Sequence, residues 1–226
     1  YMKSTISCLL FFYFAIYNNS VNAENISAKY NVSTNGITIG VLFWELSKND
    51  LKYSLSIKLK NKGFLSPLLR FEGKYAVYGG VLNDIFVPQY YSQHWATNKK
   101  KRVVEIDFKN DNIVSLKQKP DEKEFPRIDT RDLNGYVDPL SSFLNLMNGK
   151  DESKTIDGRR VYNLVLSSAF IEENKKTYVV KKYTNIWADH KKNNLKEIAI
   201  IKKRNSLLPE AIYINFNERI FSILVD

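Results

Sequence analysis

Residues 51–60, with the sequence LKYSLSIKLK, alternate without a break between apolar and polar side chains. Successive side chains of a β-strand point to opposite faces of the sheet, so this segment has one apolar face and one face of Lys and Ser. Similar short runs follow, separated by Gly, Pro, Asn or Asp at intervals of roughly 8–12 residues. The pattern predicts a mainly β fold, in which an antiparallel sheet is strongly bent or forms a half-open barrel.

Residues 138–148, with the sequence DPLSSFLNLMN, show a helical pattern. Asp138 can accept hydrogen bonds at a helix start, and Pro139 suits the first helical position because its missing N–H would have no partner there. Gly149 follows in the usual place for a helix end. Four apolar residues at helical spacing form one face, namely Leu140, Phe143, Leu144 and Met147. We predict one inserted helix, packed on the concave side of the sheet.

The first 23 residues have the pattern of a secretory signal peptide. Lys3 gives a positive start, residues 6–17 form a short apolar run, and Ala23 supplies the small residue before a cleavage site. The apolar run is shorter than the roughly 20 residues that a membrane-spanning helix needs. We therefore predict secretion with cleavage after Ala23, with an uncleaved anchor as the alternative.

The predicted mature chain, residues 24–226, is long enough for one domain with a sizeable core. The only cysteine, Cys8, lies in the signal segment, so this domain has neither a thiol nucleophile nor a thiolate metal ligand. Its sequence contains no second apolar run of membrane length. We expect a single β-rich domain that is soluble or peripheral to the membrane.

The formal net charge is +10, and the excess is mostly Lys distributed along predicted strands and turns. Lys on exposed strands also hinders edge-to-edge pairing of sheets. Residues 98–102, NKKKR, form a dense basic run between two strand-like segments, which favours a solvated hairpin connection. No RNA-recognition signature, zinc-finger spacing or basic helix accompanies them. We predict no nucleic-acid partner, and a basic surface that favours peripheral contact with an anionic membrane.

Residues with catalytic chemistry are sparse and scattered. The two histidines, His94 and His190, lie far apart, and neither belongs to a metal-binding pair. The sequence contains no G-x-S-x-G nucleophile motif, Walker loop or dinucleotide-binding glycine motif. Asp129 and Asp132 fall in a polar loop over residues 118–135, where solvated carboxylates are the simpler interpretation. We predict no catalytic residue, no metal and no cofactor, although carboxylates distant in sequence could still meet in the fold.

The segment DGRR, residues 157–160, is compatible with a corner of the fold and with an anion site. Asp-Gly is a turn signal, and a strand that begins at Arg159 would send the Arg159 and Arg160 side chains to opposite faces. One guanidinium could then clamp a phosphate or carboxylate with two hydrogen bonds. We favour a turn with a structural Arg that is paired with Asp138 or Asp157.

Four longer segments occur in order along the chain: AKYNVSTNGITIG, FEGKYAVYGGVLNDIFVPQYY, YVDPLSSFLNLMNGKDESKTIDGRRVYNLVL and LLPEAIYINF. Through them, over most of residues 26–225, the chain resembles a bacterial envelope family known as domain of unknown function 3108. The resemblance implies a secreted protein of Gram-negative bacteria. It also implies a fold similar to the lipoprotein-localisation factors LolA and LolB, an incomplete barrel with an apolar cavity under a helical lid. It implies no catalytic residues, because the family has no settled activity.

The leading hypothesis is a non-enzymatic periplasmic protein that binds a lipid, an acyl chain or a lipoprotein anchor. A bent sheet with one helix has difficulty filling its concave side, and leftover apolar space is the usual form of a small-molecule site. The residues predicted to close this cavity as a lid are Leu140, Phe143, Leu144 and Met147. The alternative is a structural or adaptor protein of the envelope, with a filled core and a protein partner. An enzyme acting on envelope polymers is the third hypothesis.

Overall fold

A computed structural model describes residues 23–62, 71–172, 174–187, 194–202 and 205–226. Within these residues, helix α1 (Pro139–Met147) and the short 3-10 helix η1 (Thr130–Asp132) accompany thirteen strands. The strands are β1 (Glu24–Thr34), β2 (Ile37–Lys48), β3 (Lys52–Asn61), β4 (Phe71–Leu82), β5 (Ile85–Thr97), β6 (Lys101–Lys109), β7 (Asn112–Lys119), β8 (Glu152–Ile156), β9 (Arg160–Glu172), β10 (Lys175–Asn185), β11 (Leu195–Lys202), β12 (Pro209–Phe216) and β13 (Arg219–Val225). The signal segment up to residue 22, and His190, lie outside the described residues.

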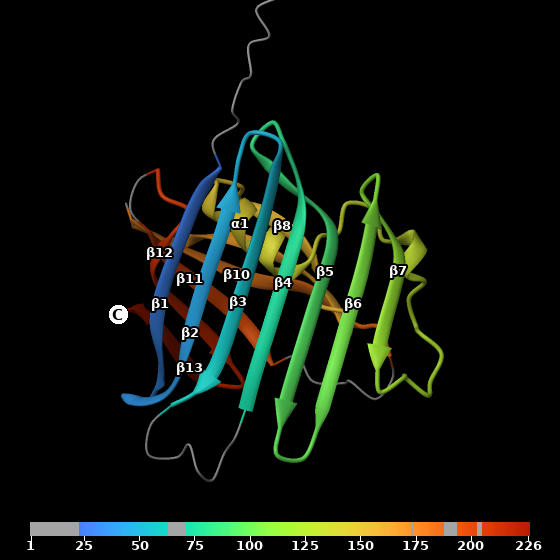
Figure 1. The fold of residues 1–226 in the computed structure, drawn as a ribbon, viewed down its shortest axis with the longest axis horizontal. Coiled ribbons are helices and arrows are strands. Elements are labelled where there is room, and N and C mark those ends of the chain that lie inside the picture. Colours follow the sequence, from blue (N-terminus) through green and yellow to red (C-terminus); the bar gives the residue numbers. More distant parts are fainter. Residues whose placement is uncertain (1–22, 63–70, 173, 188–193, 203–204) are drawn as a thin grey trace, which may run out of the picture.

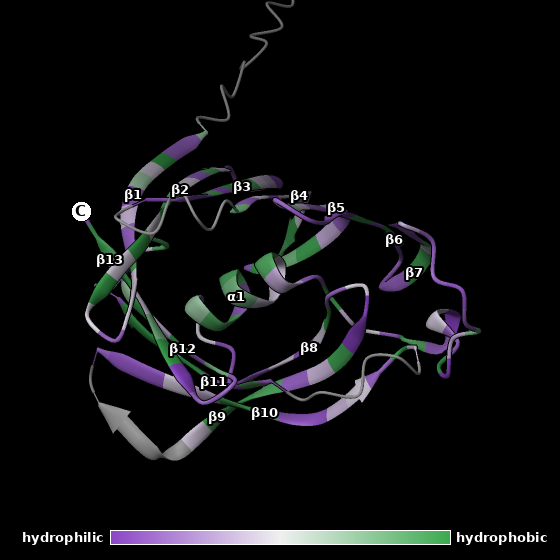
Figure 2. Cartoon of the chain, turned by 90° about the horizontal axis from the view of Figure 1, so that it is seen from below, coloured by the Kyte–Doolittle hydropathy of each residue, from purple (hydrophilic) through white to green (hydrophobic). Residues whose placement is uncertain are grey.

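Hydrogen bonds connect the strands into one antiparallel sheet, in the order β7-β6-β5-β4-β3-β2-β1-β13-β12-β11-β10-β9-β8. The end strands β7 and β8 do not pair with each other, so the sheet stays open. Figure 1 shows β1–β7 as a layer in front of the remaining strands, and Figure 2 shows the sheet curving round α1. This arrangement confirms the predicted fold class, a strongly bent antiparallel sheet with one helix on its concave side.

Tight two-residue turns join several of the strands. Asn35 and Gly36, between β1 and β2, have φ angles of +49° and +75°, the geometry that an Asn-Gly pair favours. The turns at 83–84, 110–111 and 217–218 also have positive φ at both residues, and Asn comes first in each. Asn tolerates this conformation better than most side chains, so these turns fix which residues of neighbouring strands face each other.

Helix α1 lies inside the bent sheet (Figure 2). Seven of its nine residues are buried, namely Leu140, Ser141, Ser142, Leu144, Asn145, Leu146 and Met147. A helix on a protein surface buries one apolar stripe, whereas a helix that other elements surround is buried on most of its circumference. The single apolar face read from the sequence therefore underestimates the burial of α1, which is a central element of the core.

The apolar residues of α1 divide between two clusters. Leu140 and Leu144 pack in the larger cluster, together with Trp44 and other inward-facing strand residues. The smaller cluster contains Leu146, Met147, Tyr162, Leu164, Tyr178 and Ile200. The helix thus contributes side chains to the packing of both parts of the bent sheet.

A buried carboxylate holds the start of α1. Asp138 is 0% exposed, and its Oδ1 accepts hydrogen bonds from the N–H groups of Leu140 at 2.9 Å and Ser141 at 3.1 Å. Its other oxygen accepts from the Ser141 hydroxyl, whose Oγ lies 2.6 Å from the Tyr53 hydroxyl on β3. Burial raises the pKa of Asp138 to about 6, although these hydrogen bonds act in the opposite direction. This chain of polar groups fixes the N-terminus of α1 to β3.

The C-terminal half of α1 is hydrogen-bonded to β5. The Asn145 side chain accepts from the Phe86 N–H at 2.8 Å and donates to the Phe86 carbonyl at 3.0 Å. Pairing of β5 with β6 covers only Tyr90–Ala96, so Phe86 lies beyond the end of that ladder. Asn145 therefore supplies the two partners that a neighbouring strand supplies elsewhere in the sheet.

The DGRR segment forms the turn between β8 and β9, and it bridges the opening of the sheet. The Asp157 carboxylate accepts hydrogen bonds from the N–H groups of Arg159 at 2.9 Å and Arg160 at 2.8 Å, which holds the turn. The Gln118 side chain on β7 donates to the Gly158 carbonyl at 2.9 Å. The turn at one end of the sheet therefore contacts the strand at its other end.

Replacing Gly158 by Ala should destabilise the protein by about 1–3 kcal/mol. Gly158 has a φ of +86°, and a Cβ at this position would lie 2.3 Å from Cγ1 of the buried Val104 on β6. The substitution therefore combines backbone strain with overpacking against a branched side chain. Urea denaturation measures the loss. Gly135→Ala is the matched control, because Gly135 has a φ of +73° and open space around it. Equal losses in the two variants would contradict the packing argument.

Candidate binding pockets

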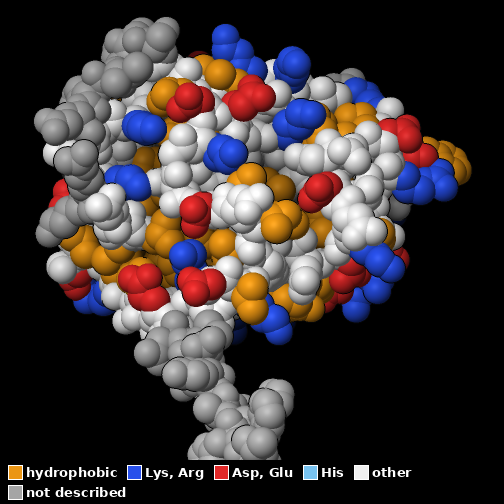
Figure 3. All heavy atoms as spheres, turned by 90° about the horizontal axis from the view of Figure 1, so that it is seen from above, with side chains coloured by type: hydrophobic (Ala, Val, Ile, Leu, Met, Phe, Trp, Pro, Cys, Tyr) orange, Lys and Arg blue, Asp and Glu red, His pale blue; other side chains and the backbone are white. Residues whose placement is uncertain are grey.

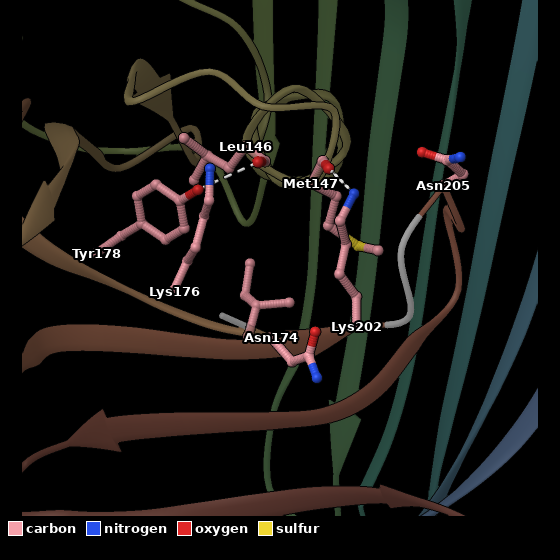
Figure 4. A pocket seen from close by; sticks show the side chains of 8 residues that line it. Leu146, Met147, Asn174, Lys176, Tyr178, Lys202 and Asn205 are labelled. Carbon is pink, nitrogen blue, oxygen red and sulfur yellow. Dashed lines mark hydrogen bonds between the residues drawn. The ribbon is translucent and has the colours of Figure 1, made fainter. Parts of the chain in front are cut away.

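Two cavities of the described structure are lined by groups that can bind a ligand. The first, named here the lysine pocket, has a volume of about 370 Å³ and lies between the end of α1 and strands β10 and β11 (Figure 4). It is lined by Leu146, Met147, Asn174, Lys176, Tyr178, Ile200, Lys202 and Asn205. The second, named here the arginine cleft, has a volume of about 550 Å³. It is lined by Tyr75, Gln93, Trp95, Lys100, Arg102, Val103, Val104, Gln118, Lys119, Pro120, Asp157, Arg159, Arg160 and Phe216.

Strand register assembles the lysine pocket. Strands β10 and β11 pair Lys176 with Ile200. Residues two apart on a strand share a face, so Tyr178 and Lys202 lie on the same side as this pair. Figure 4 shows the side chains of Lys176, Tyr178 and Lys202 directed toward the end of α1. The buried residues of the lining form an apolar floor, which consists of Leu146, Met147, Tyr178 and Ile200.

The lysine pocket is positively charged. The Lys202 ammonium donates to the Met147 carbonyl at the C-terminus of α1, where the helix dipole is negative. Burial, and to a smaller extent the charge of Lys176, lower the pKa of Lys202. Among the described residues, no carboxylate lies within ion-pair distance of either lysine. An acidic group in this pocket would therefore offset the repulsion between the two ammonium groups.

The four residues proposed as a lid do not lie together at this pocket. Leu140 and Leu144 are 8% and 0% exposed and belong to the larger core cluster. The Phe143 ring packs edge-on against the Trp44 ring, with 5.8 Å between the centroids. Of the four, Met147 lines the lysine pocket. Helix α1 is thus a wall of the pocket and a part of the core, rather than a cover over a central cavity.

Sequence reasoning missed the two lysines of the pocket. Strand alternation already indicated which residues share a face. In KKTYV it puts Lys176 on the same face as Tyr178, and in IAIIK it puts Ile200 on the same face as Lys202. Nothing local indicates that these faces meet the end of a helix, because Lys202 contacts a carbonyl that lies 55 residues earlier in the chain. The pocket is a product of the long-range fold.

Both arginines that the sequence suggested as anion ligands line the arginine cleft. The expectation that they point to opposite faces assumed a strand from Arg159, whereas β9 begins at Arg160 and Arg159 belongs to the turn. Arg159 forms an ion pair with Glu122, and Arg160 forms one with Asp157 at 3.2 Å. The two guanidinium groups therefore have a structural role in the corner and also face a cavity.

Of the other residues singled out for catalysis, His94 lies on a strand, whereas Asp129 and Asp132 lie together at η1. His94 is exposed on β5, and Asp129 caps η1. Asp129 accepts hydrogen bonds from Arg131, which lower the pKa of this carboxylate to about 2. In the described part of the chain, no group of three His, Cys, Asp or Glu side chains is placed to hold a metal ion. The same part contains no helix with the length and apolar character to span a membrane.

Positive charge is dispersed over the face of the molecule that Figure 3 shows. Lys and Arg side chains on this face are separated by acidic, apolar and uncharged groups. This arrangement corresponds to the wide distribution of Lys along the sequence. The two pockets concentrate positive charge locally, next to groups that can recognise other parts of a ligand.

A solved structure resembles this fold over nearly its whole length. It is the crystal structure of a beta-barrel-like protein of domain of unknown function DUF1849 from Brucella abortus, with a TM-score of 0.50 and 11% sequence identity. The alignment covers 89% of this chain and 95% of that chain. At such low identity the likeness shows the fold alone. No curated protein matches the chain in sequence.

The amino-acid sequence of the chain also matches the model of a protein family. The model described as "Protein of unknown function (DUF3108)" matches residues 29–201, which is well over half of the chain. The matched region includes strands of both parts of the bent sheet, the helix α1 and the DGRR turn. Of the four segments that suggested this family, the first three fall in the matched region except for Ala28, whereas LLPEAIYINF, residues 207–216, lies beyond it. The chain belongs to the DUF3108 family.

Proposed function

We propose that the protein binds an anionic amphiphile in the lysine pocket, without catalysing a reaction. The observation that supports this proposal is the presence, in one cavity, of an apolar floor and the ammonium groups of Lys176 and Lys202. A fatty acid, or the acidic head and first carbons of a lipid, has the matching chemistry. Together with the signal-peptide pattern of residues 1–23, this ligand class leads us to propose the periplasm as the site of action.

The two parts of the pocket would contribute different terms to binding. Apolar surface that a ligand removes from water contributes roughly 25 cal/mol per Å². The flexible Met147 side chain allows the floor to adapt to chains of different shape. The volume of about 370 Å³ lies in the lower part of the range of small-molecule sites, roughly 300–1,000 Å³. The pocket therefore suits one small amphiphile or one end of a larger one.

The proposed ligand lies at the end of the concave side, and not at its centre as the sequence suggested. The centre is occupied by α1, and Leu144 at the middle of the helix is 0% exposed. The end of the helix leaves the space that β10 and β11 complete. A lipid or the acyl chain of a lipoprotein would then enter beside α1, and the helix would not need to open as a lid.

A filled core also favours the alternative function, an envelope adaptor that binds a protein partner. Seven of the nine residues of α1 are buried, so the helix occupies the concave side. The open sheet has β7 as an end strand, and Val114 on this strand is 58% exposed. Such a strand can accept another strand from a partner. An adaptor of this kind requires no lipid, which separates the two functions experimentally.

The test is a titration of the mature chain, residues 24–226, with a dansyl-labelled fatty acid, followed by fluorescence. We expect Lys176→Gln to weaken binding about tenfold, because the variant loses a charge-assisted contact to the carboxylate. Lys181→Gln is the matched control, because Lys181 is exposed on the same strand and does not line the pocket. The corresponding fatty alcohol has no charge and should bind Lys176→Gln and the unaltered protein equally.

Native mass spectrometry of protein purified from periplasm without detergent complements the titration. Bound lipid that is lost on extraction with organic solvent would support the proposal and identify the ligand class. A protein that carries no lipid and binds no fatty acid would contradict it and favour the adaptor. Equal weakening by Lys176→Gln and Lys181→Gln would also count against the pocket, since it would indicate a general effect of charge.

A further inference from the structure

The arginine cleft lies at the opposite end of the strands from the lysine pocket. Strand β10 begins beside the lysine pocket and ends at Asn185, which pairs with Arg160 of the cleft. Strand β12 begins at Pro209, which pairs with Lys202, and ends at Phe216, which lines the cleft. The two cavities share no lining residue. A substitution in one can therefore be tested without altering the lining of the other.

Strand alternation directs polar side chains into this end of the concave face. On β6, Val104 is buried in the core, and Arg102 two residues earlier shares its face. On β5, the buried Tyr91 is followed on the same face by Gln93 and Trp95. Arg102, Gln93 and Trp95 all line the cleft. The apolar interior thus gives way to a polar and cationic surface at this end of the sheet.

Positive charge exceeds negative charge in the cleft. The charged residues of its lining are Lys100, Arg102, Lys119, Arg159, Arg160 and Asp157. Arg159 and Arg160 are paired with Glu122 and Asp157. The other three cations have no carboxylate of the described residues within ion-pair distance. Three positive charges therefore remain for a ligand.

Unpaired buried donors and aromatic side chains in the cleft are also typical of a binding site. The Nε atoms of Arg159 and Arg160 are buried and have no hydrogen-bond partner among the described residues, although buried donors in proteins are nearly always paired. Three aromatic residues, Tyr75, Trp95 and Phe216, also line the cleft. Aromatic faces are surfaces on which the apolar face of a ring can pack.

We infer that the arginine cleft binds a phosphorylated small molecule whose ring packs against these aromatic side chains. Guanidinium groups bind phosphate oxygens through parallel hydrogen bonds, and three unpaired cations match a doubly charged phosphate better than a single carboxylate. The volume of about 550 Å³ suits a ligand of the size of a sugar phosphate. The same phosphate group occurs on phospholipid heads, and the experiment distinguishes the two sources. This site is separate from the proposed amphiphile site and does not depend on it.

The test compares Arg102→Gln with Lys101→Gln. Each variant loses one positive charge on β6, but Lys101 is exposed and does not line the cleft. Isothermal titration calorimetry with inorganic pyrophosphate and glucose 6-phosphate measures soluble ligands, and flotation with phosphatidylglycerol vesicles measures headgroups. We expect Arg102→Gln to weaken binding about tenfold and Lys101→Gln to leave it within about twofold. Binding should also weaken with rising salt concentration, because exposed charges are screened.

Binding of glucose 6-phosphate that depends on Arg102 would support a soluble ligand, and vesicle binding with the same dependence would support a lipid headgroup. Absence of binding to all three probes, or equal effects of the two variants, would overturn the inference. Lys119→Gln provides a second cleft variant if Arg102→Gln fails to fold, since Lys119 is exposed at the end of β7. Fatty-acid binding should be unchanged in Arg102→Gln, so the two proposals can fail independently.

Discussion

Replacing Asn145 by Leu should lower the free energy of unfolding by about 2–5 kcal/mol. Leu keeps the branched shape of the Asn side chain, although it is larger, and it can neither donate nor accept a hydrogen bond. The variant would leave the Phe86 N–H and carbonyl without the partners that Asn145 provides at 2.8 Å and 3.0 Å. Each buried polar group that loses its partner costs about 1–3 kcal/mol. Urea denaturation followed by far-ultraviolet circular dichroism measures the loss.

The matched control is Asn148→Ala, at the residue that follows the same helix. Asn148 also donates to a backbone carbonyl near the start of β5, that of Asp84 at 2.6 Å, but it is exposed. Water can replace this hydrogen bond, so we expect a loss of no more than about 1 kcal/mol. If Asn145→Leu lost no more stability than Asn148→Ala, the Phe86 N–H and carbonyl would have found other hydrogen-bond partners. That result would contradict the interpretation that Asn145 takes the place of a neighbouring strand.

Replacing Asp138 by Ala should destabilise the protein by about 2–4 kcal/mol. The variant loses the cap of α1 and leaves the N–H groups of Leu140 and Ser141 without partners in a buried site. It also removes the acceptor for the Ser141 hydroxyl, which lies against Tyr53. Because α1 is central to the core, we expect the loss to appear as reduced global stability, measured by urea denaturation at pH 7.

The same residue should make stability depend on pH. Burial raises the pKa of Asp138 from 3.8 to about 6 in the folded protein. Between these values the folded state binds more protons than the unfolded state, so this residue stabilises the fold as pH falls from 7 to 4. The contribution is at most about 3 kcal/mol, since one pKa unit corresponds to about 1.4 kcal/mol. At pH 7 the ionised Asp138 is therefore less favourable to the fold than its protonated form.

Asp138→Asn isolates this effect from the general titration of the other carboxylates. The Asn side chain keeps an oxygen for the helix cap but does not ionise, and the Ser141 hydroxyl can rotate to accept from its amide. We expect the gain in stability between pH 7 and pH 4.5 to be smaller in Asp138→Asn than in the unaltered protein by about 2 kcal/mol. The same gain in both proteins would show that Asp138 does not carry the pH dependence.

Local rules account for much of the fold. Alternation over residues 51–60 corresponds to β3, and the Asp138-Pro139 signal corresponds to the start of α1. These features are readable because strand alternation and helix capping depend on residues only a few positions apart. The burial of Asn145 is not readable in the same way. A polar residue in a helix is expected to face solvent, and only the end of the β5–β6 ladder at Tyr90–Ala96 explains why this one faces Phe86.

The sequence by itself determined the class of fold, the place of the helix, and the presence of a turn at DGRR. The tertiary structure alone decided that this turn bridges the opening of the sheet, that α1 fills the concave side, and that Lys176 and Lys202 meet at the end of the helix. The physical reason is the range of the interactions. Hydrogen bonds within a turn or a helix start are set by neighbours in the chain, whereas a pocket is formed by side chains that many residues of intervening chain bring together.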